Sequence, residues 1–351
     1  MVFLVSALVA YGVTKLSIVL SLRRGVLDLP NVRSSHSQPM PRMGGVGILA
    51  GFYVAVGGLI LLGPRAGLES GLLTRETFLF ALAGAGMAII GLCDDLYHLS
   101  PPAKFLMQFV LVACLLAFGA RVDSLTLPFG KPCTLGFLAL PVTMLWLTGF
   151  ANIFNFMDGI NGMAAGTGVV YSGLFFLVAR SQGDQDLATL AVVLGGSCLG
   201  FLFHNFPVAR TFMGDTGSLF LGIVFALFVV RLPQRSSNPA SLVALLLGTS
   251  IYLWDSGFTL LRRLKARENI FLAHRSHLYQ RLVQAGLTHV KVTALYVSLQ
   301  ALMGVFAFIY LSSSDFARLG ILVVAGLLLA GLTGFVYWLE LRQGAKKATA
   351  M

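Results

Sequence analysis

Apolar residues gather in eleven long stretches, and a short polar segment separates each stretch from the next. The stretches are 2–22, 44–63, 76–93, 105–120, 135–151, 162–180, 187–203, 217–232, 239–258, 291–311 and 317–339. A helix that spans a membrane needs about 20 predominantly apolar residues. The pattern therefore predicts an all-α, polytopic membrane protein with 10–11 transmembrane helices. The stretch 135–151 accounts for the range, because it is short and contains Pro141.

Composition agrees with a membrane location and excludes an ordinary soluble fold. Charged residues make up 11% of the 351 residues, whereas soluble proteins carry roughly 25%. The first stretch has Arg23 and Arg24 after it and no basic segment before it, so we expect it to remain as a span and not to be removed as a secretory signal. No repeat or long soluble insert interrupts the chain. We therefore expect a single integral-membrane domain over residues 1–351.

Two sequence features resemble a cysteine-based site and a dinucleotide-binding motif, and we expect neither function here. The cysteines (Cys93, Cys114, Cys133 and Cys198) form no C-x-x-C pair, and three lie in apolar stretches, so they are expected to be small core residues. The segment from Gly45 to Ala50 matches the dinucleotide fingerprint G-x-G-x-x-A, but it opens an apolar stretch instead of following a strand. Close packing of helices explains these glycines better.

The formal net charge of +11 reflects topology and not nucleic-acid binding, because the basic residues lie in short loops. Counted over alternate loops, one side of the membrane has 15 Lys and Arg residues and the other has 8. The more basic side is expected to be cytoplasmic, which places the N-terminus outside and the C-terminus inside. The polar segments that could carry chemistry then all fall on the cytoplasmic side. One cytoplasmic site is therefore expected.

A pair of carboxylates ends the third stretch. Asp94 and Asp95 repel each other at a membrane boundary, and a divalent cation or a nearby lysine would relieve the repulsion. Lys104 is the candidate lysine. Because neighbours on a helix point about 100° apart, one carboxylate can face a metal while the other faces a substrate or base. The alternative is a pair that only solvates a helix end.

Two later segments combine oxygen ligands with glycines. Polar residues at Asn152, Asn155, Asp158 and Asn161 recur near helical spacing and offer the hard oxygen ligands that Mg²⁺ accepts. Caps and hydrogen bonds between helices are the alternative. The segment 204–218 has glycines and Asp215 directly before an apolar stretch, where a helix N-terminus favours phosphate. Asp215 is equally compatible with an ordinary N-cap.

The segment 262–281 is basic and contains two histidines, His274 and His277, at a spacing of three. A basic loop beside the inner leaflet is usually a topology signal or a lipid contact. Zinc is a weak alternative, because no cysteine or third histidine is suitably spaced. Arginine and histidine around a polyphosphate is the stronger interpretation, since guanidinium pairs with phosphate in a bidentate manner.

Five motifs, taken in order, resemble those of one enzyme family. The motifs are SSHSQPMPRMGG, GLCDDLYHLSPPAK, NIFNFMDGING, HNFPVARTFMGDTGS and HRSHLYQRL. The chain resembles the polyprenyl-phosphate N-acetylhexosamine-1-phosphate transferases of glycosyltransferase family 4, and it looks closest to the WecA/WbpL-like branch that starts O-antigen or related surface glycans. The resemblance covers about residues 25–285. It implies ten or eleven membrane helices with a cytoplasmic, Mg²⁺-dependent site in the bacterial inner membrane.

The motifs and the resemblance together give each candidate residue an expected role. The expected catalytic residues are Asp94, Asp95 and Asp158. The expected metal ligands, for Mg²⁺ or for Mn²⁺ in its place, are Asn155 and Asp215. The residues expected to bind substrate are Arg42, Lys104, Asn161, Asn205, Phe212, His274, Arg275 and His277. Among these, the ring of Phe212 matches a position that can stack on uracil.

The resemblance also implies the reaction and its partners. Members of the family transfer a sugar-1-phosphate from a UDP-sugar to undecaprenyl phosphate and release UMP, so the expected partners are undecaprenyl phosphate and a UDP-N-acetylhexosamine. The sequence allows a homodimer. Because a phosphomonoester has a second pKa of about 6, a strong general base is hardly needed. We therefore expect Asp94 or Asp95 to orient the acceptor or to remove its residual proton.

Two positions depart from the family pattern. Many bacterial relatives have a second aspartate where this chain has Asn161, which argues against a base role for that position. The histidine motif has Arg275 and Ser276 between its ends instead of a central histidine, which leaves the donor sugar open.

Two other classes of protein remain as alternatives. A carrier or flippase of lipid-linked sugars would place ionisable residues near mid-membrane, where only Lys15 and Asp255 qualify. A non-catalytic homologue is supported by Asn161 alone.

Overall fold

The computed structural model describes residues 1–30, 38–62, 74–269 and 274–349, and within the last range it places side chains up to Gln343. Helices dominate the fold. The helices before the middle of the chain are α1 (Val2–Arg24), α2 (Gly45–Leu62), α3 (Arg75–Tyr97), α4 (Pro101–Ala117), the 3-10 turn η2 (Gly136–Leu138) and α5 (Ala139–Phe156). The later helices are α6 (Met163–Ser181), α7 (Gln185–Asn205), α8 (Gly214–Gln234), α9 (Ser241–Gly248), α10 (Ser250–Lys265), α11 (Leu278–Gln284), α12 (His289–Ser312) and α13 (Asp315–Thr349).

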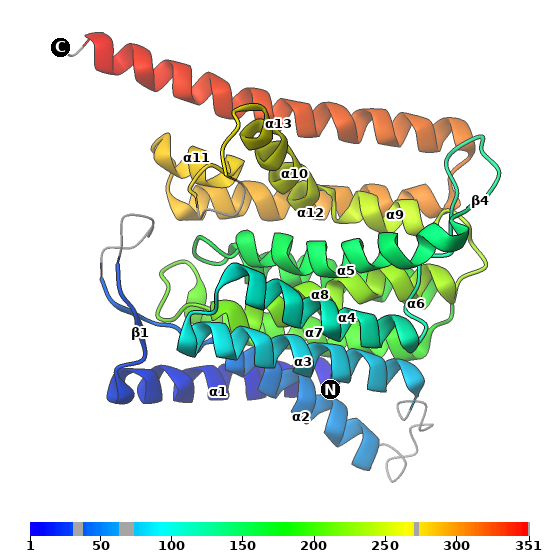
Figure 1. The fold of residues 1–351 in the computed structure, drawn as a ribbon, viewed down its shortest axis with the longest axis horizontal. Coiled ribbons are helices and arrows are strands. Elements are labelled where there is room, and N and C mark those ends of the chain that lie inside the picture. Colours follow the sequence, from blue (N-terminus) through cyan, green and yellow to red (C-terminus); the bar gives the residue numbers. More distant parts are fainter. Residues whose placement is uncertain (31–37, 63–73, 270–273, 350–351) are drawn as a thin grey trace.

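Most of these helices lie side by side with their axes roughly parallel (Figure 1). Within the described ranges, nine helices are long and apolar enough to cross a membrane, and α9 with α10 forms a tenth, bent candidate. The remaining apolar helix, α4, is shorter. The expectation of an all-α polytopic membrane protein is therefore confirmed. The uncertain stretch 135–151 belongs to a helical segment, Gly136–Phe156, whose 21 residues are enough to span.

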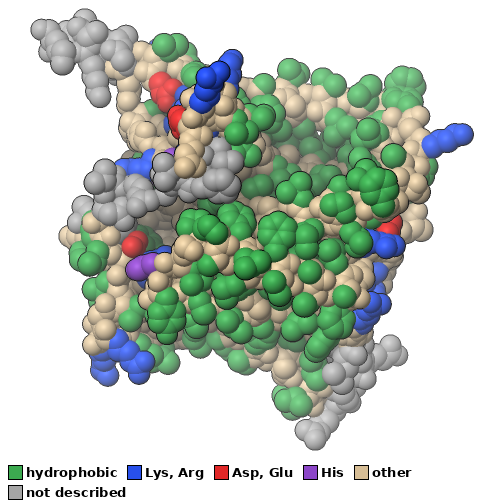
Figure 2. All heavy atoms as spheres, in the orientation of Figure 1, with side chains coloured by type: hydrophobic (Ala, Val, Ile, Leu, Met, Phe, Trp, Pro, Cys, Tyr) green, Lys and Arg blue, Asp and Glu red, His purple; other side chains and the backbone are tan. Residues whose placement is uncertain are grey.

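Hydrophobic side chains cover the middle of the molecule, and charged side chains gather towards its two ends (Figure 2). The most buried helix is α8, which is apolar on every side from Leu219 to Val230 and packs against α3 and α5. A helix that is hydrophobic all round belongs in the centre of a bundle. This central position brings the first residues of α8 to the end of α3.

The stretch 239–258 is expected from the sequence to form one span, but it is not one straight helix. The chain bends by 69° between α9 and α10. The Thr249 hydroxyl donates to the carbonyl oxygens of Leu245 (3.1 Å) and Leu246 (3.2 Å), a local pattern that bends helices. The Gln300 side chain of α12 donates to the Gly248 carbonyl at the break, so that acceptor stays satisfied inside the protein. As a result, α10 leaves the bundle direction and ends in the basic residues at 262–265.

Two short antiparallel hairpins mark opposite ends of the bundle (Figure 1). The strands β1 (Leu27–Asp28) and β2 (Met40–Pro41) lie at the end that also contains α11. The strands β3 (Ser124–Leu125) and β4 (Cys133–Thr134) lie at the far end. The four cysteines are free thiols, and only Cys198 is buried. The expectation that all four are small core residues is wrong for Cys114 and Cys133, which are exposed on the surface of the bundle.

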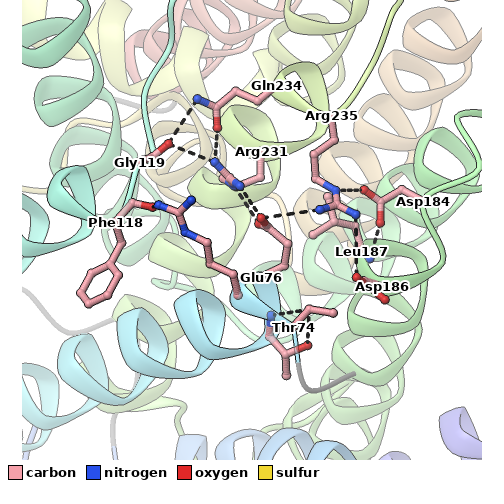
Figure 3. Close-up of polar contacts among 12 residues, drawn as sticks. Thr74, Glu76, Phe118, Gly119, Asp184, Asp186, Leu187, Arg231, Gln234 and Arg235 are labelled. Carbon is pink, nitrogen blue, oxygen red and sulfur yellow. Dashed lines mark hydrogen bonds and ion pairs between the residues drawn. The ribbon is translucent and has the colours of Figure 1, made fainter. Parts of the chain in front are cut away.

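A network of buried ion pairs joins three helices at the far end (Figure 3). Arg231 of α8 forms a bidentate pair with Glu76 of α3, in which Nε lies 2.7 Å from the carboxylate. Arg235 bonds Asp184 and lies 3.7 Å from both Glu76 and Asp186. The acidic residues stand at the N-terminal ends of α3 and α7 and the arginines at the C-terminal end of α8, so each charge also complements a helix dipole. The network therefore fixes how α3, α7 and α8 align along their length.

The glycines of the apparent dinucleotide fingerprint serve helix packing. Gly47 lies so close to α1 that an added Cβ would collide with the Thr14 side chain and approach the Ala10 carbonyl within 2.8 Å. The fingerprint requires a preceding strand followed by a helix that binds phosphate. Here the segment opens α2 against α1, so the packing interpretation is confirmed.

Candidate active site

The last turn of α3 places two adjacent carboxylates at the end of the bundle that contains α11. Asp94 accepts a hydrogen bond from Lys104 Nζ at 2.8 Å, and the same ammonium group also contacts Asp215. Lys104 is thus a partner of Asp94, as the sequence predicts, but its second carboxylate is Asp215 and not Asp95. It also joins α3, α4 and α8 at one point, although Asp94 and Asp215 are 121 residues apart in the chain.

Asp95 faces away from this lysine. It belongs to α3 and caps the N-terminus of the neighbouring helix α8. Its carboxylate accepts hydrogen bonds from the backbone N–H of Asp215 (3.0 Å), the backbone N–H of Thr216 (2.9 Å) and the Thr216 hydroxyl (2.8 Å). Arg42 Nε pairs with the same carboxylate at 2.9 Å. A carboxylate at a helix N-terminus satisfies free N–H groups and complements the helix dipole. The alternative that Asp215 is the N-cap is therefore wrong, because Asp215 lies inside the first turn and Asp95 supplies the cap.

Asp215 lies at the centre of the site. Its carboxylate contacts Lys104, accepts a hydrogen bond from Asn155 Nδ2 at 3.1 Å and lies 3.9 Å from Arg42 Nη2. Asn155 Nδ2 also contacts the Ser218 hydroxyl at 2.8 Å. Gly214, before Asp215, has a φ of +70°, and an added Cβ would lie 2.6 Å from the Arg42 carbonyl and 2.8 Å from an Asp95 oxygen. Only glycine fits this combination of conformation and space.

The charges of this cluster do not balance. Within the described part of the chain, three carboxylates (Asp94, Asp95 and Asp215) meet two cations (Arg42 and Lys104). The three carboxylates outnumber the two cations by one, and Asp215 lies between both cations, beside the Asn155 amide. A further cation would therefore be attracted to this position.

The segment after β2 is bonded along the segment before α8. Phe212 N–H donates to the Pro41 carbonyl at 2.8 Å, and the Gly44 and Gly45 N–H groups donate to the carbonyls of Phe212 (3.0 Å) and Met213 (2.9 Å). Arg42 therefore reaches Asp95 and Asp215 from a short ladder and not from a free loop. Phe212, whose backbone belongs to this ladder, has a half-buried side chain. The residues at 34–37 of the same motif lie outside the described residues.

The spacing of the polar residues at the end of α5 predicts that they share one face of the helix. The structure shows that they do not. The Asn152 amide exchanges hydrogen bonds with Gln108 of α4, one of them at 2.6 Å, whereas Asn155 faces α8. The helix ends at Phe156, so Asp158 lies in the loop that follows. Burial, together with the negative charges of Asp215 and Asp95, raises the pKa of Asp158 well above its usual range. A carboxyl group of this kind holds its proton more tightly than an exposed one.

Two asparagines join loops of the site. Asn205 is buried, and its side chain accepts from the Gly162 N–H at 2.7 Å and donates to the Thr211 carbonyl at 2.9 Å. Asn161 donates to the Pro207 carbonyl at 3.3 Å. Both amides thus bond backbone groups, and their expected contacts with substrate stay predictions.

The histidine segment packs against the end of α5. His277 is the residue before α11, and its ring lies 5.0 Å from the His274 ring and 6.2 Å from the Phe156 ring, measured between centroids. Burial, together with the neighbouring His277 and Arg263, lowers the pKa of His274 to about 4, so this ring is neutral near pH 7. Arg275 lies between the histidines, and its carbonyl accepts from Gln284 Nε2 at 2.7 Å.

The arginines of this segment are less available for phosphate than the sequence suggests. Arg281 pairs with Glu340 of α13 through two hydrogen bonds of 2.8 and 2.6 Å, and it lies over the Tyr337 ring. Arg263 pairs with Glu268 at 2.9 Å. Basic residues on one segment thus anchor neighbouring helices. The sequence could not reveal these pairs, because the partner of Arg281 comes 59 residues later.

Three site residues were missed because their partners are distant in the chain. Ser218 and Thr216 follow Asp215 on α8 and bond Asn155 and Asp95. Asp255 of α10 is fully buried and bonds the histidine segment. A single carboxylate inside an apolar stretch was the available signal for Asp255. Its bonding to the protein interior removes one of the two residues on which the carrier interpretation rests.

The oxygen-bearing side chains of the site fit a metal ion whose coordination is completed by substrate. The described residues contain no group of three or more His, Cys, Asp or Glu side chains arranged to hold a metal ion. Asp215 and Asn155 supply one carboxylate and one amide oxygen, after a turn of the Asn155 amide, whose orientation is set by its partners. Mg²⁺ is often bound by one or two protein oxygens together with phosphates and water. The pair fits that coordination and does not fit zinc.

Comparisons with known proteins agree with this arrangement. The profile of the family described as glycosyl transferase family 4 matches residues 77–233, which include Asp94, Asp95, Lys104, Asn155 and Asp215. The chain is 34% identical to a probable undecaprenyl-phosphate N-acetylglucosaminyl 1-phosphate transferase of Bacillus subtilis, over 82% of this chain and 78% of the relative. It is 31% identical to a decaprenyl-phosphate N-acetylglucosaminephosphotransferase of Mycobacterium tuberculosis, over 93% and 87% of the two chains.

A third relative differs in its sugar. The chain is 35% identical to a phospho-N-acetylmuramoyl-pentapeptide-transferase of Thermosynechococcus vestitus, over 63% of this chain and 60% of the relative. The matches to the first two relatives extend over most of both chains. The protein belongs to glycosyl transferase family 4, in the WecA-like branch of the polyprenyl-phosphate N-acetylhexosamine-1-phosphate transferases.

Proposed function

We propose that this protein transfers an N-acetylhexosamine-1-phosphate from a UDP-sugar to undecaprenyl phosphate and releases UMP. The observation that carries the proposal is the cluster in which Lys104 joins Asp94 to Asp215 beside Asn155 and Arg42. The cluster lies where helices end, at the edge of the apolar part of the molecule. A lipid phosphate and a water-soluble nucleotide can meet only at such an edge. The names of the relatives support the same reaction type.

The chemistry requires two anionic reactants to approach each other. An oxygen of the lipid phosphate bonds to the phosphorus that carries the sugar, while the bond from that phosphorus to the bridging oxygen breaks and UMP departs. Repulsion between phosphates is the main barrier in a poorly hydrated site. Lys104 and Arg42, both held in place by carboxylates, offset part of that charge and orient the phosphate groups.

Magnesium fits the remaining charge of the site, and Mn²⁺ is its expected substitute. Asp215 and Asn155 would hold the ion. When bound, it would neutralise negative charge that develops on the phosphate oxygens. Ser218, which bonds Asn155, and Lys104, which bonds Asp215, keep these two side chains next to each other.

The two adjacent aspartates have different proposed roles. Asp94 shares its lysine with Asp215 and is partly exposed, so it can orient the acceptor phosphate or take its residual proton. Asp95 contacts backbone groups of α8 and acts as a positioning residue for Asp215. Asp158 is the third acidic group. Its raised pKa suits a group that gives or takes a proton.

The nucleotide and the sugar phosphate are proposed to bind between two walls of the site. Phe212 would stack on the uracil ring, with Asn161 and Asn205 setting the shape of the neighbouring loops. His274, Arg275 and His277 would contact the diphosphate from the opposite segment. This half of the site differs from the family pattern, so we expect it to set the choice of sugar.

The proposed reaction also sets the location of the protein. A bacterial cytoplasmic membrane provides undecaprenyl phosphate, and UDP-sugars are made in the cytoplasm. The site end of the bundle should then face the cytoplasm, with the N-terminus outside and the C-terminus inside. We further propose that the product starts a lipid-linked surface glycan of the O-antigen or lipopolysaccharide type. The chain is proposed to form a single membrane domain, and a homodimer is compatible with the proposed function.

Release of UMP tests this function. Protein purified in detergent is given undecaprenyl phosphate, Mg²⁺ and a panel of UDP-N-acetylhexosamines, with EDTA as the control. Release that needs both lipid and metal, and that selects one donor, supports the proposal. No release with any donor, from folded protein that also fails to bind UDP, rejects it.

A further inference from the structure

A buried carboxylate on α10, Asp255, forms hydrogen bonds with the histidine segment at residues 277–279. Asp255 has no exposed surface, and its two oxygens accept hydrogen bonds from three elements. Oδ1 accepts from His277 Nδ1 at 3.0 Å and from the Leu278 N–H at 2.9 Å. Oδ2 accepts from the Tyr279 N–H at 3.0 Å and from the Tyr296 hydroxyl of α12 at 2.6 Å. A buried carboxylate with this many donors is held in one orientation.

The contact with Asp255 determines the state of the His277 ring. Both carboxylate oxygens already accept from other donors, so the hydrogen shared in the contact with His277 lies on Nδ1, which donates to Asp255. The other ring nitrogen, Nε2, then has a lone pair, and no described residue bonds it. A second proton on the ring would lie on Nε2.

The packing of α11 brings this ring to the active site. Tyr279, two residues after His277, donates from its hydroxyl to the Phe156 carbonyl at 3.0 Å, which ties α11 to the end of α5. That end carries Asn155, the neighbour of Asp215. The groups that face the His277 ring are His274, Phe156 and Tyr279, with ring centroids 5.0, 6.2 and 5.9 Å away. None of these neighbours is an acid, so Asp255 is the carboxylate that acts on the ring.

We propose that Asp255 is a positioning residue that acts through His277. Its carboxylate fixes the Nδ1–H form of the ring and leaves Nε2 to bind a phosphate oxygen of the nucleotide-sugar diphosphate, as a donor once it is protonated. This inference rests on the proposed function, because it assumes a diphosphate substrate. A carboxylate that orients a histidine in this way typically affects function by about 10- to 100-fold in the related case of metal ligands.

The alternative is that Asp255 only anchors α11 through the backbone N–H groups of Leu278 and Tyr279. A double-mutant cycle separates the two roles. Asp255→Asn and His277→Asn should each lower kcat for UMP release by about 10- to 100-fold, and the double variant should be no slower than His277→Asn alone. If the two losses multiply, Asp255 acts independently of the histidine and the proposal fails.

Two further variants guard against a failure to fold. His277→Asn keeps a side-chain N–H group close to the position of Nδ1, so it keeps the bond to Asp255 and loses only the Nε2 edge. We expect wild-type thermal stability with low activity; wild-type activity overturns the proposal. Tyr296→Phe is the matched control, because it removes one hydrogen bond from the same carboxylate and leaves the histidine contact intact. Its activity should stay within about threefold of wild type, since one such bond contributes only about 1 kcal/mol.

A spectroscopic measurement tests the pair without turnover. Nitrogen-15 NMR of histidine-labelled protein distinguishes a protonated from an unprotonated ring nitrogen, and the His277 signals are those absent from His277→Asn. The Nδ1–H form should be present in the wild type and lost in Asp255→Asn. A wild-type ring whose Nδ1 is unprotonated overturns the proposal even if the enzyme is active. If the wild-type protein releases no UMP, the proposed function fails, while the NMR result still decides whether Asp255 fixes the ring.

Discussion

At the scale of single residues, neighbours in the sequence have separate tasks. Asp94 and Asp95 are consecutive, yet one faces Lys104 and the other caps α8. The divergence follows from helix geometry, because adjacent residues point about 100° apart. The same substitution at these two positions should therefore have different consequences.

Replacement of each aspartate by asparagine tests this difference. Asp94→Asn should lower kcat by about 10²- to 10⁴-fold with little change in thermal stability, because the side chain is partly exposed and holds only the lysine. Asp95→Asn should lower activity and also reduce stability by about 1–3 kcal/mol, because an amide cannot accept as many bonds from the N-terminus of α8. UMP release and thermal unfolding in detergent measure the two effects. Equal loss of stability in both variants would contradict the assignment.

His274 should make the stability of the protein depend on pH. In the unfolded chain this histidine takes up a proton near pH 6.5, whereas in the folded protein burial and neighbouring positive charge delay protonation to about pH 4. Between these values the unfolded state binds more protons, so stability falls as the pH falls through this range and is unaffected above it. The melting temperature of His274→Gln should therefore drop less than that of the wild type between about pH 7 and pH 5. Parallel curves for the two proteins would show that this ring is not the cause.

At the scale of elements, α3 and α8 are joined at both ends. The site end has the Asp95 cap, and the far end has the Glu76–Arg231 pair (Figure 3). Two such contacts leave little freedom for one helix to slide along the other. The position of Asp215 relative to Asp94 therefore depends on contacts made far from the site.

Loss of the far-end pair should be costly for stability. Glu76→Gln leaves Arg231 buried without its counter-charge, and removal of one partner from a buried pair destabilises by about 3–5 kcal/mol. The matched control is Asp123→Asn at the same end of the molecule. Its pair with Arg121 is half exposed, so its loss should change stability by less than about 1 kcal/mol. Thermal unfolding compares the two, and a similar small effect in both would contradict a structural role for the buried network.

At the scale of the whole molecule, the sequence predicts the spans well and the contacts between them poorly. Span number and the end at which polar motifs gather follow from the length of apolar stretches, which the bilayer sets. The Lys104–Asp94 contact was predictable because both residues flank one short turn. The bend between α9 and α10 and the environment of Asp255 were not, because the partners of Asp255 come 22 to 41 residues later in the chain. Such contacts are set by how the helices pack, and an apolar stretch does not encode its neighbours.

Membrane orientation is the property on which the proposed function depends as a whole. The proposed reaction uses a UDP-sugar from the cytoplasm, and it therefore requires the end with Asp94 and Asp215 to face inward and the end with β3 and β4 to face outward (Figure 1). Cys133 is an exposed natural thiol on β4 and should react with a membrane-impermeant maleimide added to intact spheroplasts. A cysteine placed at the exposed Arg210, in a Cys133→Ser background, should react only after the membrane is opened. The reverse pattern would put the site outside, away from its nucleotide donor, and would reject the proposed reaction whatever the geometry of the site.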